Sequence, residues 1–595
     1  MSVSEEKISE VGRKAQENAN LIWNAANSLF GAFKPHEYGL VILPMCVIKR
    51  FHDCLLPTHD AVMEAKKKFA NAGPLKAGFL KKASGYQFYN TSEFTFDKLK
   101  ADPENIEENF DDFLQGFSDN VLEILTRMNF FAQVDRMKEA KLLYQIIVDF
   151  STEKLDMSEK HFTTVDMGYI FENLVQRFSE SYNEEAGAHF TSRDIIYLMC
   201  DLLVTNSEAL NDSDGLHCTV YDMTMGTSQM LTCMEERLKQ IDKNADVKTF
   251  GQEINPFTMG IAAADTIIHG GDPDNMKFGD TLSDDQFSGY KFDFCISNPP
   301  FGIDWKREAK EVEKESKLGE GGRFSPGLPP KSDGQMLFLL NGISKLKDNG
   351  RMAIIQNGSP LVTGDAESGP SEIRRYLIEN GWLDAIVQLP NDSFYNTGIS
   401  TYVWIIDKAK PMRNPGKIQL INASKCCVSR RKPIGSKRVD IVDECRNLVV
   451  QAYKEYITKD YSALTSDGTS ILCKSLVVDD ITLGYRKIVV ESPMLNDDGT
   501  IAKKKGKKIA DPSKRDTENV PLAEDIYEYF EREVLPYNPD AWIDDTKTKT
   551  GYEIPMTRFF YEYSMPENMD DVISRINEIE ANIELSVKKL FGKEE

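Results

Sequence analysis

The sequence predicts an α/β protein with a doubly wound, mostly parallel sheet, preceded by a helical domain and followed by a helical extension. Residues 219–297 alternate short apolar runs with helical patterns, which is typical of strands joined by crossover helices. Residues 1–155 instead show helical apolar spacing. Each of the four runs ends in a polar or acidic residue, namely Asp222, Glu253, Asp280 and Asn298. Such side chains meet at the carboxyl edge of a parallel sheet, where ligands bind.

The size and charge of the chain limit its organisation. A chain of 595 residues predicts two to four domains, and we place them at 1–155, 156–490 and 491–595. The net charge is −23, whereas proteins that bind nucleic acid alone are usually basic. If the ligand is DNA, local basic patches or another subunit must therefore supply much of the affinity.

Several classes of site lack their sequence signals. The ten cysteines include no CxxC pair, the seven histidines form no HxxxH pattern, and no phosphate-binding GxxxxGK[ST] loop occurs. We therefore expect reduced, mostly buried thiols and no metal site. No apolar run approaches the length of a membrane span, so we expect a cytoplasmic protein.

Helical candidates fill the first domain. They are residues 19–26, 38–53 with Pro44 as a kink or an end, 51–84 as an exposed helix, 110–125 and 141–150.

The first strand, 219–222, leads into a loop with small residues and then a helix to Lys239. Such a loop passes close to a ligand, and the helix start offers it free amides. The second strand, 248–253, ends in Glu253, and an acid at that place commonly accepts both hydroxyls of a ribose. The third, 276–280, ends in Asp280.

The fourth strand, 291–297, runs into Asn298-Pro299-Pro300-Phe301. The prolines end ladder pairing, which leaves an amide, a rigid backbone and an aromatic ring at the strand's end. The Asn298 amide and a backbone carbonyl can accept hydrogen bonds from an amino group, and the ring can stack on a flat heterocycle. A plain turn after a core strand is the alternative for this motif taken alone.

The remaining chain continues the pattern. Thr191 and Ser192 precede a predicted helix at 195–203. Capping of the helix N-terminus would by itself explain hydroxyl side chains at this place. Residues 302–332 predict a mobile active-site loop with a solvated helix at 306–317. We expect helices at 333–348 and 371–380, strands at 351–356 and 382–389, and the last strand of the sheet at 400–407. Basic residues at 430–438 suit a phosphate contact or an exposed loop equally. Residues 503–508 predict a hairpin tip, for which a solvated loop is the first interpretation and a nucleic-acid contact the second. Residues 569–590 predict a coiled-coil-like helix.

The order of these motifs resembles the γ-class adenine-N6 DNA methyltransferases, and more closely the methylation subunit of type I restriction–modification systems. The resemblance extends to SDGQMLFLL, NGSPLVTGDAESGPSEIRRYLIEN, LPNDSFYNTGISTYVWII and PDAWIDDTKTKTGYEIP, and it covers nearly the whole chain. It implies a Rossmann-like sheet that binds S-adenosylmethionine.

The resemblance also implies roles for individual residues. Glu253 would hold the ribose hydroxyls, and Asp280 would read the adenine amino group of the cofactor. Asn298 and the carbonyl of Pro299 would accept hydrogen bonds from the target adenine, with Pro300 next to them and Phe301 stacked on the flipped base. The segment over the methionine end would be Ala188, His189, Phe190, Thr191, Ser192 and Arg193, and the first cofactor loop would be Asp222, Gly226, Thr227, Ser228 and Gln229.

The resemblance implies methyl transfer to the N6 of adenine in DNA, at a site chosen by a separate specificity subunit. An ATP-dependent restriction subunit joins such complexes, and we expect two copies of this chain in each. The first loop departs from the family's Asp-Pro and Gly-Thr-Gly-Gly pattern at Met223, Ser228 and Gln229. A non-catalytic scaffold that has lost cofactor binding is therefore the alternative, and a protein-glutamine or RNA methyltransferase is a third.

Overall fold

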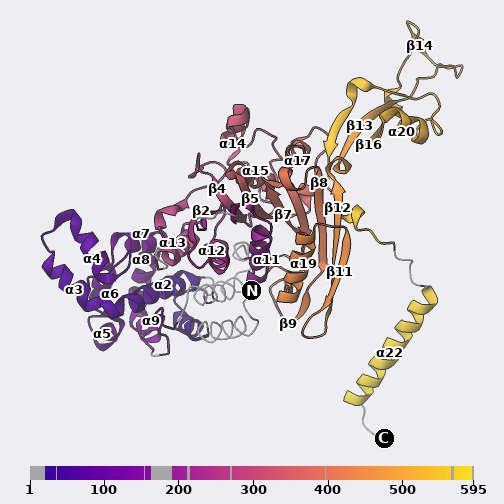
Figure 1. Ribbon diagram of the computed structural model, residues 1–595. Coiled ribbons are helices and arrows are strands. Elements are labelled where there is room, and N and C mark those ends of the chain that lie inside the picture. Colours follow the sequence, from indigo (N-terminus) through magenta and orange to yellow (C-terminus); the bar gives the residue numbers. More distant parts are fainter. Residues whose placement is uncertain are drawn as a thin grey trace. The chain divides into compact units, whose positions relative to one another are not determined.

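A ten-stranded sheet runs through the computed structural model (Figure 1). The structure describes residues 20–34, 37–152, 154–161, 170, 174, 191–210, 215–268, 271–395, 397–563 and 568–591. Two units can be distinguished, Met1–Ile554 and Pro555–Glu595, and the sheet belongs to the first.

The half of the sheet that carries the four polar strand ends is parallel, in the order β3-β2-β1-β4-β5. This confirms the doubly wound α/β prediction. Strand β4, between β1 and β5, is buried along its whole length, which explains the apolar run before Asn298. The strands are β1 (His217–Asp222), β2 (Asp246–Glu253), β3 (Met276–Phe278), β4 (Phe292–Ser297) and β5 (Leu346–Asn357).

The other half of the sheet corrects one prediction. We expected 400–407 to be the last strand, but β7 (Thr401–Asp407) lies inside the sheet, antiparallel to both β5 and β6. Parallel β8 and then antiparallel β12 and β11 continue beyond β6. Local patterning could not show this, because the neighbours of a strand depend on long-range pairing. The further strands are β6 (Leu383–Gln388), β8 (Lys417–Lys425), β11 (Lys459–Leu464) and β12 (Ser470–Asp479).

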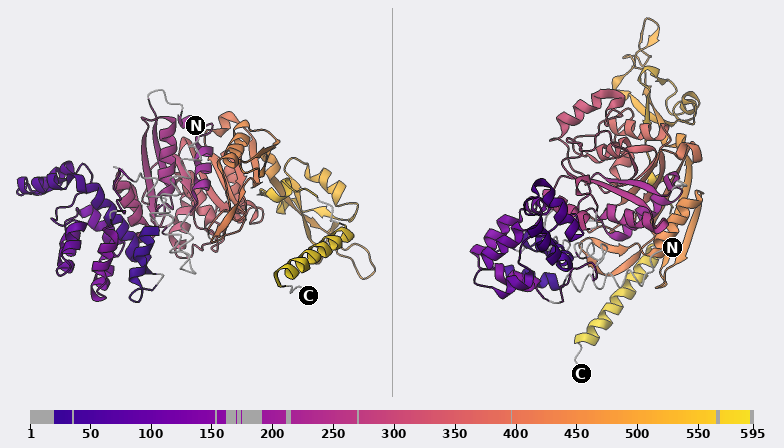
Figure 2. Two further views of the ribbon diagram at one scale, coloured as in Figure 1. Left: turned by 90° about the horizontal axis from the view of Figure 1, so that it is seen from below. Right: turned by 60° about the vertical axis from the view of Figure 1, so that its left-hand side comes forward.

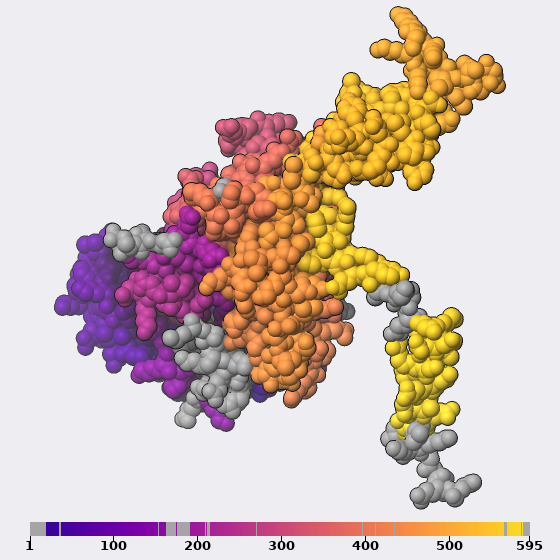
Figure 3. All heavy atoms as spheres, turned by 45° about the vertical axis from the view of Figure 1, so that its right-hand side comes forward, coloured from indigo at the N-terminus to yellow at the C-terminus, as the bar shows by residue number. Residues whose placement is uncertain are grey.

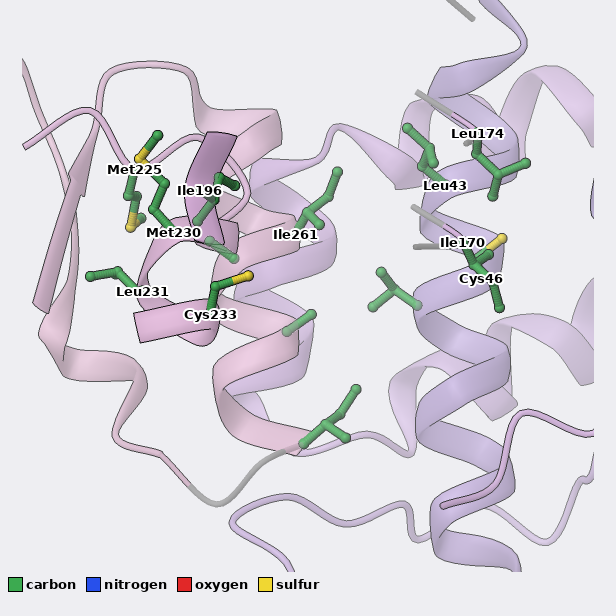
Figure 4. Packing of buried hydrophobic residues seen from close by; sticks show 14 of the residues in the cluster. Leu43, Cys46, Ile170, Leu174, Ile196, Met225, Met230, Leu231, Cys233 and Ile261 are labelled. Carbon is green, nitrogen blue, oxygen red and sulfur yellow. The ribbon is translucent and has the colours of Figure 1, made fainter. Parts of the chain in front are cut away.

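Helices pack on the sheet and hold its carboxyl edge in place. Figure 4 shows Met225 and Met230 beside Ile196, so the loop after β1 rests on two helices. The helices are α11 (Arg193–Val204), α12 (Gln229–Ile241), α13 (Pro256–Ile268), α15 (Gln335–Ser344), α16 (Ser359–Val362), α17 (Gly369–Glu379), α18 (Lys410–Arg413) and α19 (Asp443–Glu455).

The N-terminal region is helical, as predicted, and lies beside α13 (Figures 1 and 2). A Cβ on Gly260 of α13 would come within 2.6 Å of Met128, so this contact is tight. Residues 110–125 divide into two helices at Gly116, and the helix with Pro44 continues through it. The helices are α2 (Gly39–Leu55), α3 (His59–Lys68), α4 (Lys76–Ser84), α5 (Phe96–Ala101), α6 (Ile106–Gln115), α7 (Asp119–Arg127), α8 (Phe130–Glu139) and α9 (Leu143–Phe150).

The chain after Gly302 is held by internal bonds. Arg323 bonds to the carboxylate of Glu315 at 2.7 Å and to the carbonyl oxygen of Thr281 at 2.7 Å. The expected solvated helix is short, α14 (Ala309–Glu315), and it buries Ala309 and Val312. The residues at 430–438 form a hairpin of β9 (Val428–Ile434) and β10 (Lys437–Asp440), in which Lys437 is buried.

A small four-stranded sheet lies near the end of the first unit. Its strand β13 (Gly484–Glu491) spans the boundary expected at 490 and 491 and pairs with three later strands. The predicted lysine hairpin is present as β14 (Lys503–Lys504) and β15 (Lys507–Lys508). The other elements are β16 (Asp516–Pro521), α20 (Ile526–Glu533), β17 (Trp542–Ile543) and β18 (Lys549–Tyr552).

The second unit contains α21 (Met556–Phe559) and α22 (Met569–Phe591), where the coiled-coil-like helix was predicted. Within this unit the apolar residues Ile576, Ile579 and Ile583 are exposed. None of the described helices is long and apolar enough to cross a membrane.

Candidate active site

A cavity of about 670 Å³ lies at the carboxyl edge of the parallel strands. Cavities of this size suit a ligand as large as a nucleoside derivative. It brings together eleven of the residues that the sequence singled out: Thr191, Asp222, Gly226, Thr227, Gln229, Glu253, Asp280, Asn298, Pro299, Pro300 and Phe301. Ser192, Arg193 and Ser228 are buried next to these residues in the chain, and Ala188, His189 and Phe190 lie outside the described residues.

Asn298 occupies the wall of the cavity directly after β4. Its Nδ2 donates a hydrogen bond of 2.7 Å to Thr191 Oγ1. Its Oδ1 is buried and accepts no hydrogen bond from any residue that the structure describes. A buried acceptor without a donor costs free energy, so this oxygen is suited to a donor on a ligand.

Four aromatic side chains line the cavity, those of Phe301, Trp305, Phe338 and Phe394. Phe301 lies edge-on to Phe394, with 6.3 Å between the ring centres and an angle of 79° between the planes. In the sequence, Phe394 stands out only as part of the segment LPNDSFYNTGISTYVWII, which carries the family resemblance. A ring pair of this kind offers a flat apolar surface to a planar heterocycle.

Asp222 is a buried carboxyl at the end of β1. It accepts hydrogen bonds from Ser297 Oγ at 2.6 Å and from the Thr224 amide at 3.0 Å. Burial raises its pKa to about 7, although these two bonds oppose the shift. A cationic group beside Asp222 would favour the ionised carboxylate.

Glu253 connects the second strand to the loop after the first. Its Oε2 accepts a hydrogen bond of 2.9 Å from the Gly226 amide, and its Oε1 one of 2.8 Å from the Asn255 amide. Gly226 has a φ of 53° and Ser228 a φ of 64°. Ser228 therefore adopts the left-handed conformation that glycine takes up most readily, at the residue just before α12.

Asp280 and Glu308 form a pair of neighbouring carboxyls in the cavity wall. Asp280 Oδ1 accepts a hydrogen bond of 2.8 Å from the Leu282 amide. Burial and the nearby Asp280 raise the pKa of Glu308. Sequence analysis missed Glu308, because it lies in a run of alternating charges that resembles a solvated helix.

Lys437 holds together two segments of the chain that lie next to residues of the cavity. Its buried ammonium donates hydrogen bonds to Ser192 Oγ at 3.2 Å, to Asp194 at 2.9 Å and to the carbonyl oxygen of Ser393 at 3.1 Å. Burial disfavours ionisation of Asp194, but Lys437 and the Ile441 amide keep the pKa of that carboxyl below its usual value. One lysine thus ties the segment beside Thr191 to the loop that carries Phe394.

The arrangement favours a ligand that donates hydrogen bonds. Three carboxyls, from Asp222, Glu253 and Asp280, face one cavity with the unused oxygen of Asn298. Among the residues that the structure describes, no group of three or more His, Cys, Asp or Glu side chains could hold a metal ion.

Comparison with models of protein families shows to which family of α/β proteins this chain belongs. The family model described as N-6 DNA Methylase matches residues 163–485, which include the whole cavity, and the HsdM N-terminal domain model matches residues 18–150. The chain belongs to the N-6 DNA methylase family. This confirms the family resemblance that the motif order indicated.

Individual proteins of known type agree with this membership in the N-6 DNA methylases. The chain is 30% identical over 196 residues to the type I restriction enzyme MjaIX methylase subunit of Methanocaldococcus jannaschii, which covers 33% of this chain and 34% of that protein. It is 27% identical over 240 residues to the type I restriction enzyme HindI methylase subunit of Haemophilus influenzae. This match covers 40% of this chain and 49% of that protein. The matches thus span less than half of each relative.

One solved structure supports the fold. The type I restriction–modification methyltransferase subunit of Streptococcus thermophilus aligns with a TM-score of 0.61 at 22% identity, over 79% of this chain and 97% of that one. At this identity the likeness shows that the N-6 DNA methylase fold is shared.

Proposed function

We propose that this protein transfers a methyl group from S-adenosylmethionine to the exocyclic N6 of adenine in DNA. The observation that carries the proposal is the buried, unused Oδ1 of Asn298, placed between Thr191 and the Pro299–Phe301 segment. An adenine amino group supplies the donor that this oxygen lacks.

The residues of the cavity fit S-adenosylmethionine. The cofactor carries an ammonium group, two ribose hydroxyls and an adenine amino group, all of which donate hydrogen bonds. Asp222, Glu253 and Asp280 offer an acceptor for each, and Asp304 and Glu308 add two further carboxyls to the cavity wall. Asp222 would face the methionine end, Glu253 the ribose and Asp280 the adenine, with Ala188 to Arg193 closing over the methionine end.

The part of the cavity that would hold the target base would act by positioning its amino group. The lone pair of the adenine N6 is conjugated with the ring, so the nitrogen is a poor nucleophile. Asn298 Oδ1 and the Pro299 carbonyl would hold its two hydrogens, draw it toward tetrahedral geometry and free the lone pair. Phe301 would stack on the flipped base and offset part of the few kcal/mol that flipping costs. S-adenosylmethionine supplies a methyl group that its sulfonium already activates, so orientation matters more than a strong base.

We further propose that the chain works in a restriction–modification complex in the cytoplasm. A separate specificity subunit would choose the DNA site, two copies of this chain would join it, and an ATP-dependent restriction subunit would complete the assembly. The exposed apolar residues of α22 offer a helical docking face for the specificity subunit. We also propose the predicted domains 1–155, 156–490 and 491–595 as its working parts.

The direct test uses tritiated S-adenosylmethionine and DNA, with the chain co-expressed with a candidate specificity subunit. Label recovered as N6-methyladenine after nucleoside digestion supports the proposal. Label found only in protein or RNA would refute it.

A non-catalytic scaffold is the second candidate, and the conformation of Ser228 favours it. Left-handed backbone with a side chain is strained, and Gln229 adds bulk to the cavity wall. Calorimetry on the assembled complex distinguishes the two functions. Failure to detect S-adenosylmethionine binding would favour the scaffold.

A further inference from the structure

The most basic stretch of the chain is the hairpin at residues 503–508, which we call the lysine hairpin. Five of its six residues are lysines, in a chain with a net charge of −23. All six residues are exposed. Figures 1 and 3 show the hairpin projecting from the small sheet of β13 and β16.

The hairpin brings like charges together. Lys503 pairs with Lys508 across the two strands, and Lys504 pairs with Lys507. Directly opposite residues have Cβ atoms roughly 4.5–5.5 Å apart, and like charges there repel each other. The turn enforces this register, because Lys505 and Gly506 both have positive φ, 53° and 81°, as a two-residue hairpin requires.

Most of this charge has no acidic partner in the part of the chain that the structure describes. Lys508 reaches Asp540 at 3.2 Å, whereas Lys503, Lys504, Lys505 and Lys507 form no ion pair with a described residue. In the other basic hairpin, two of the five basic residues have acidic partners, since Arg430 pairs with Asp440 and the buried Lys437 with Asp194. An external polyanion would relieve the repulsion in the lysine hairpin.

The base of the hairpin is firmly held. The Ala502 amide donates to the carbonyl oxygen of Met494 at 2.8 Å, and the Ile509 amide to that of Ala502 at 2.9 Å. The lysines are therefore presented on an ordered ribbon. The segment 494–515 contains no aromatic residue that could stack on a base.

We propose that the lysine hairpin binds the phosphate backbone of duplex DNA, outside the site that holds the target base. This inference rests on the proposed function, because it takes DNA as the substrate. Lysines act as point charges and suit evenly spaced phosphates without regard to sequence. The hairpin thus supplies one of the local basic patches that an acidic DNA enzyme requires.

The test compares two variants of the full chain, co-expressed with its specificity subunit. The variant K504Q/K507Q loses two lysine charges that face each other across the hairpin. The control K67Q/K82Q loses two exposed lysines of α3 and α4. The affinity for a fluorescent duplex is measured by anisotropy over a range of salt concentrations. The logarithm of the affinity falls linearly with the logarithm of the salt concentration. We expect the magnitude of this slope to decrease by about 1.8 in the hairpin variant and to stay unchanged in the control.

The rate at saturating DNA should stay at the wild-type value, since neither lysine lines the cavity. A hairpin variant with the salt slope of the control would overturn the inference. Loss of the specificity subunit on size exclusion with an unchanged slope would also overturn it, because the hairpin would then bind protein. If the wild type neither binds nor methylates DNA, the proposed function itself fails; wild-type activity with an unaffected variant refutes the hairpin alone.

Discussion

Thr191 and Asn298 are joined by a 2.7 Å hydrogen bond from Nδ2 to Oγ1, although 107 residues separate them in the chain. The bond fixes which end of the amide donates, and so leaves Oδ1 as the acceptor in the cavity. The target-base site thus depends on a residue of the segment that would cover the cofactor.

Replacing Asn298 should therefore separate chemistry from cofactor binding. We expect Asn298→Ala to abolish methyl transfer while the affinity for S-adenosylmethionine, measured by calorimetry, stays within a factor of about three, since Asn298 would contact only the base. A loss of cofactor affinity as large as the loss of methyl transfer would contradict the assignment of Asn298 to the target base.

Thr191 should act through Asn298. Thr191→Val removes the acceptor that orients the amide, and we expect kcat to fall roughly tenfold, the value of one hydrogen bond. Thr191→Ser keeps the hydroxyl and should restore kcat. Equal activity of the two variants would show that this bond does not position Asn298.

Ser228 should be a strained position. We expect Ser228→Gly to raise the free energy of unfolding by about 1 kcal/mol, because glycine adopts a φ of 64° without a Cβ clash. Thermal unfolding measures this change. Ser228→Ala is the control, since it removes the hydroxyl but keeps the strain. A glycine variant no more stable than the alanine variant would argue against strain.

Asp222 should make stability depend on pH. Its folded pKa of about 7 lies above the ordinary value of 3.8, so its contribution to stability is complete below pH 3.8 and is lost progressively as the pH rises from there through 7. From pH 6 to pH 8 this group should cost about 1.4 kcal/mol. Thermal unfolding of the wild type and Asp222→Asn at both pH values tests this. Parallel curves would contradict the raised pKa.

Lys437 should stabilise the fold behind the cavity. Lys437→Met leaves the partly buried Asp194 without its cation, and we expect a loss of about 3 kcal/mol in unfolding free energy. The neighbouring Arg438 is exposed, so Arg438→Met should change stability by less than about 0.5 kcal/mol. Denaturant unfolding compares the two. Similar losses would show that the buried contacts of Lys437 contribute little.

Sequence reasoning predicted the parallel half of the fold well, because each strand there has its own apolar run and a polar end. It also brought Asp222, Glu253, Asp280 and Asn298 to one cavity. It did not single out Glu308, and it placed Lys437 in a basic patch for phosphate or solvent, whereas Lys437 is buried against Asp194, 243 positions away in the chain. Charged residues look solvated in a sequence, and only the fold shows which of them are buried.

The position of β7 has a consequence for the order in which the protein forms during synthesis. β5 and β6 each pair with β7, which comes after both in the chain. Until residue 407 has left the ribosome, β5 and β6 lack the strand that joins them, so their edges carry unpaired backbone N–H and C=O groups. Such edges invite wrong pairing, so the nascent chain is exposed to aggregation over this interval and is a natural client for chaperones.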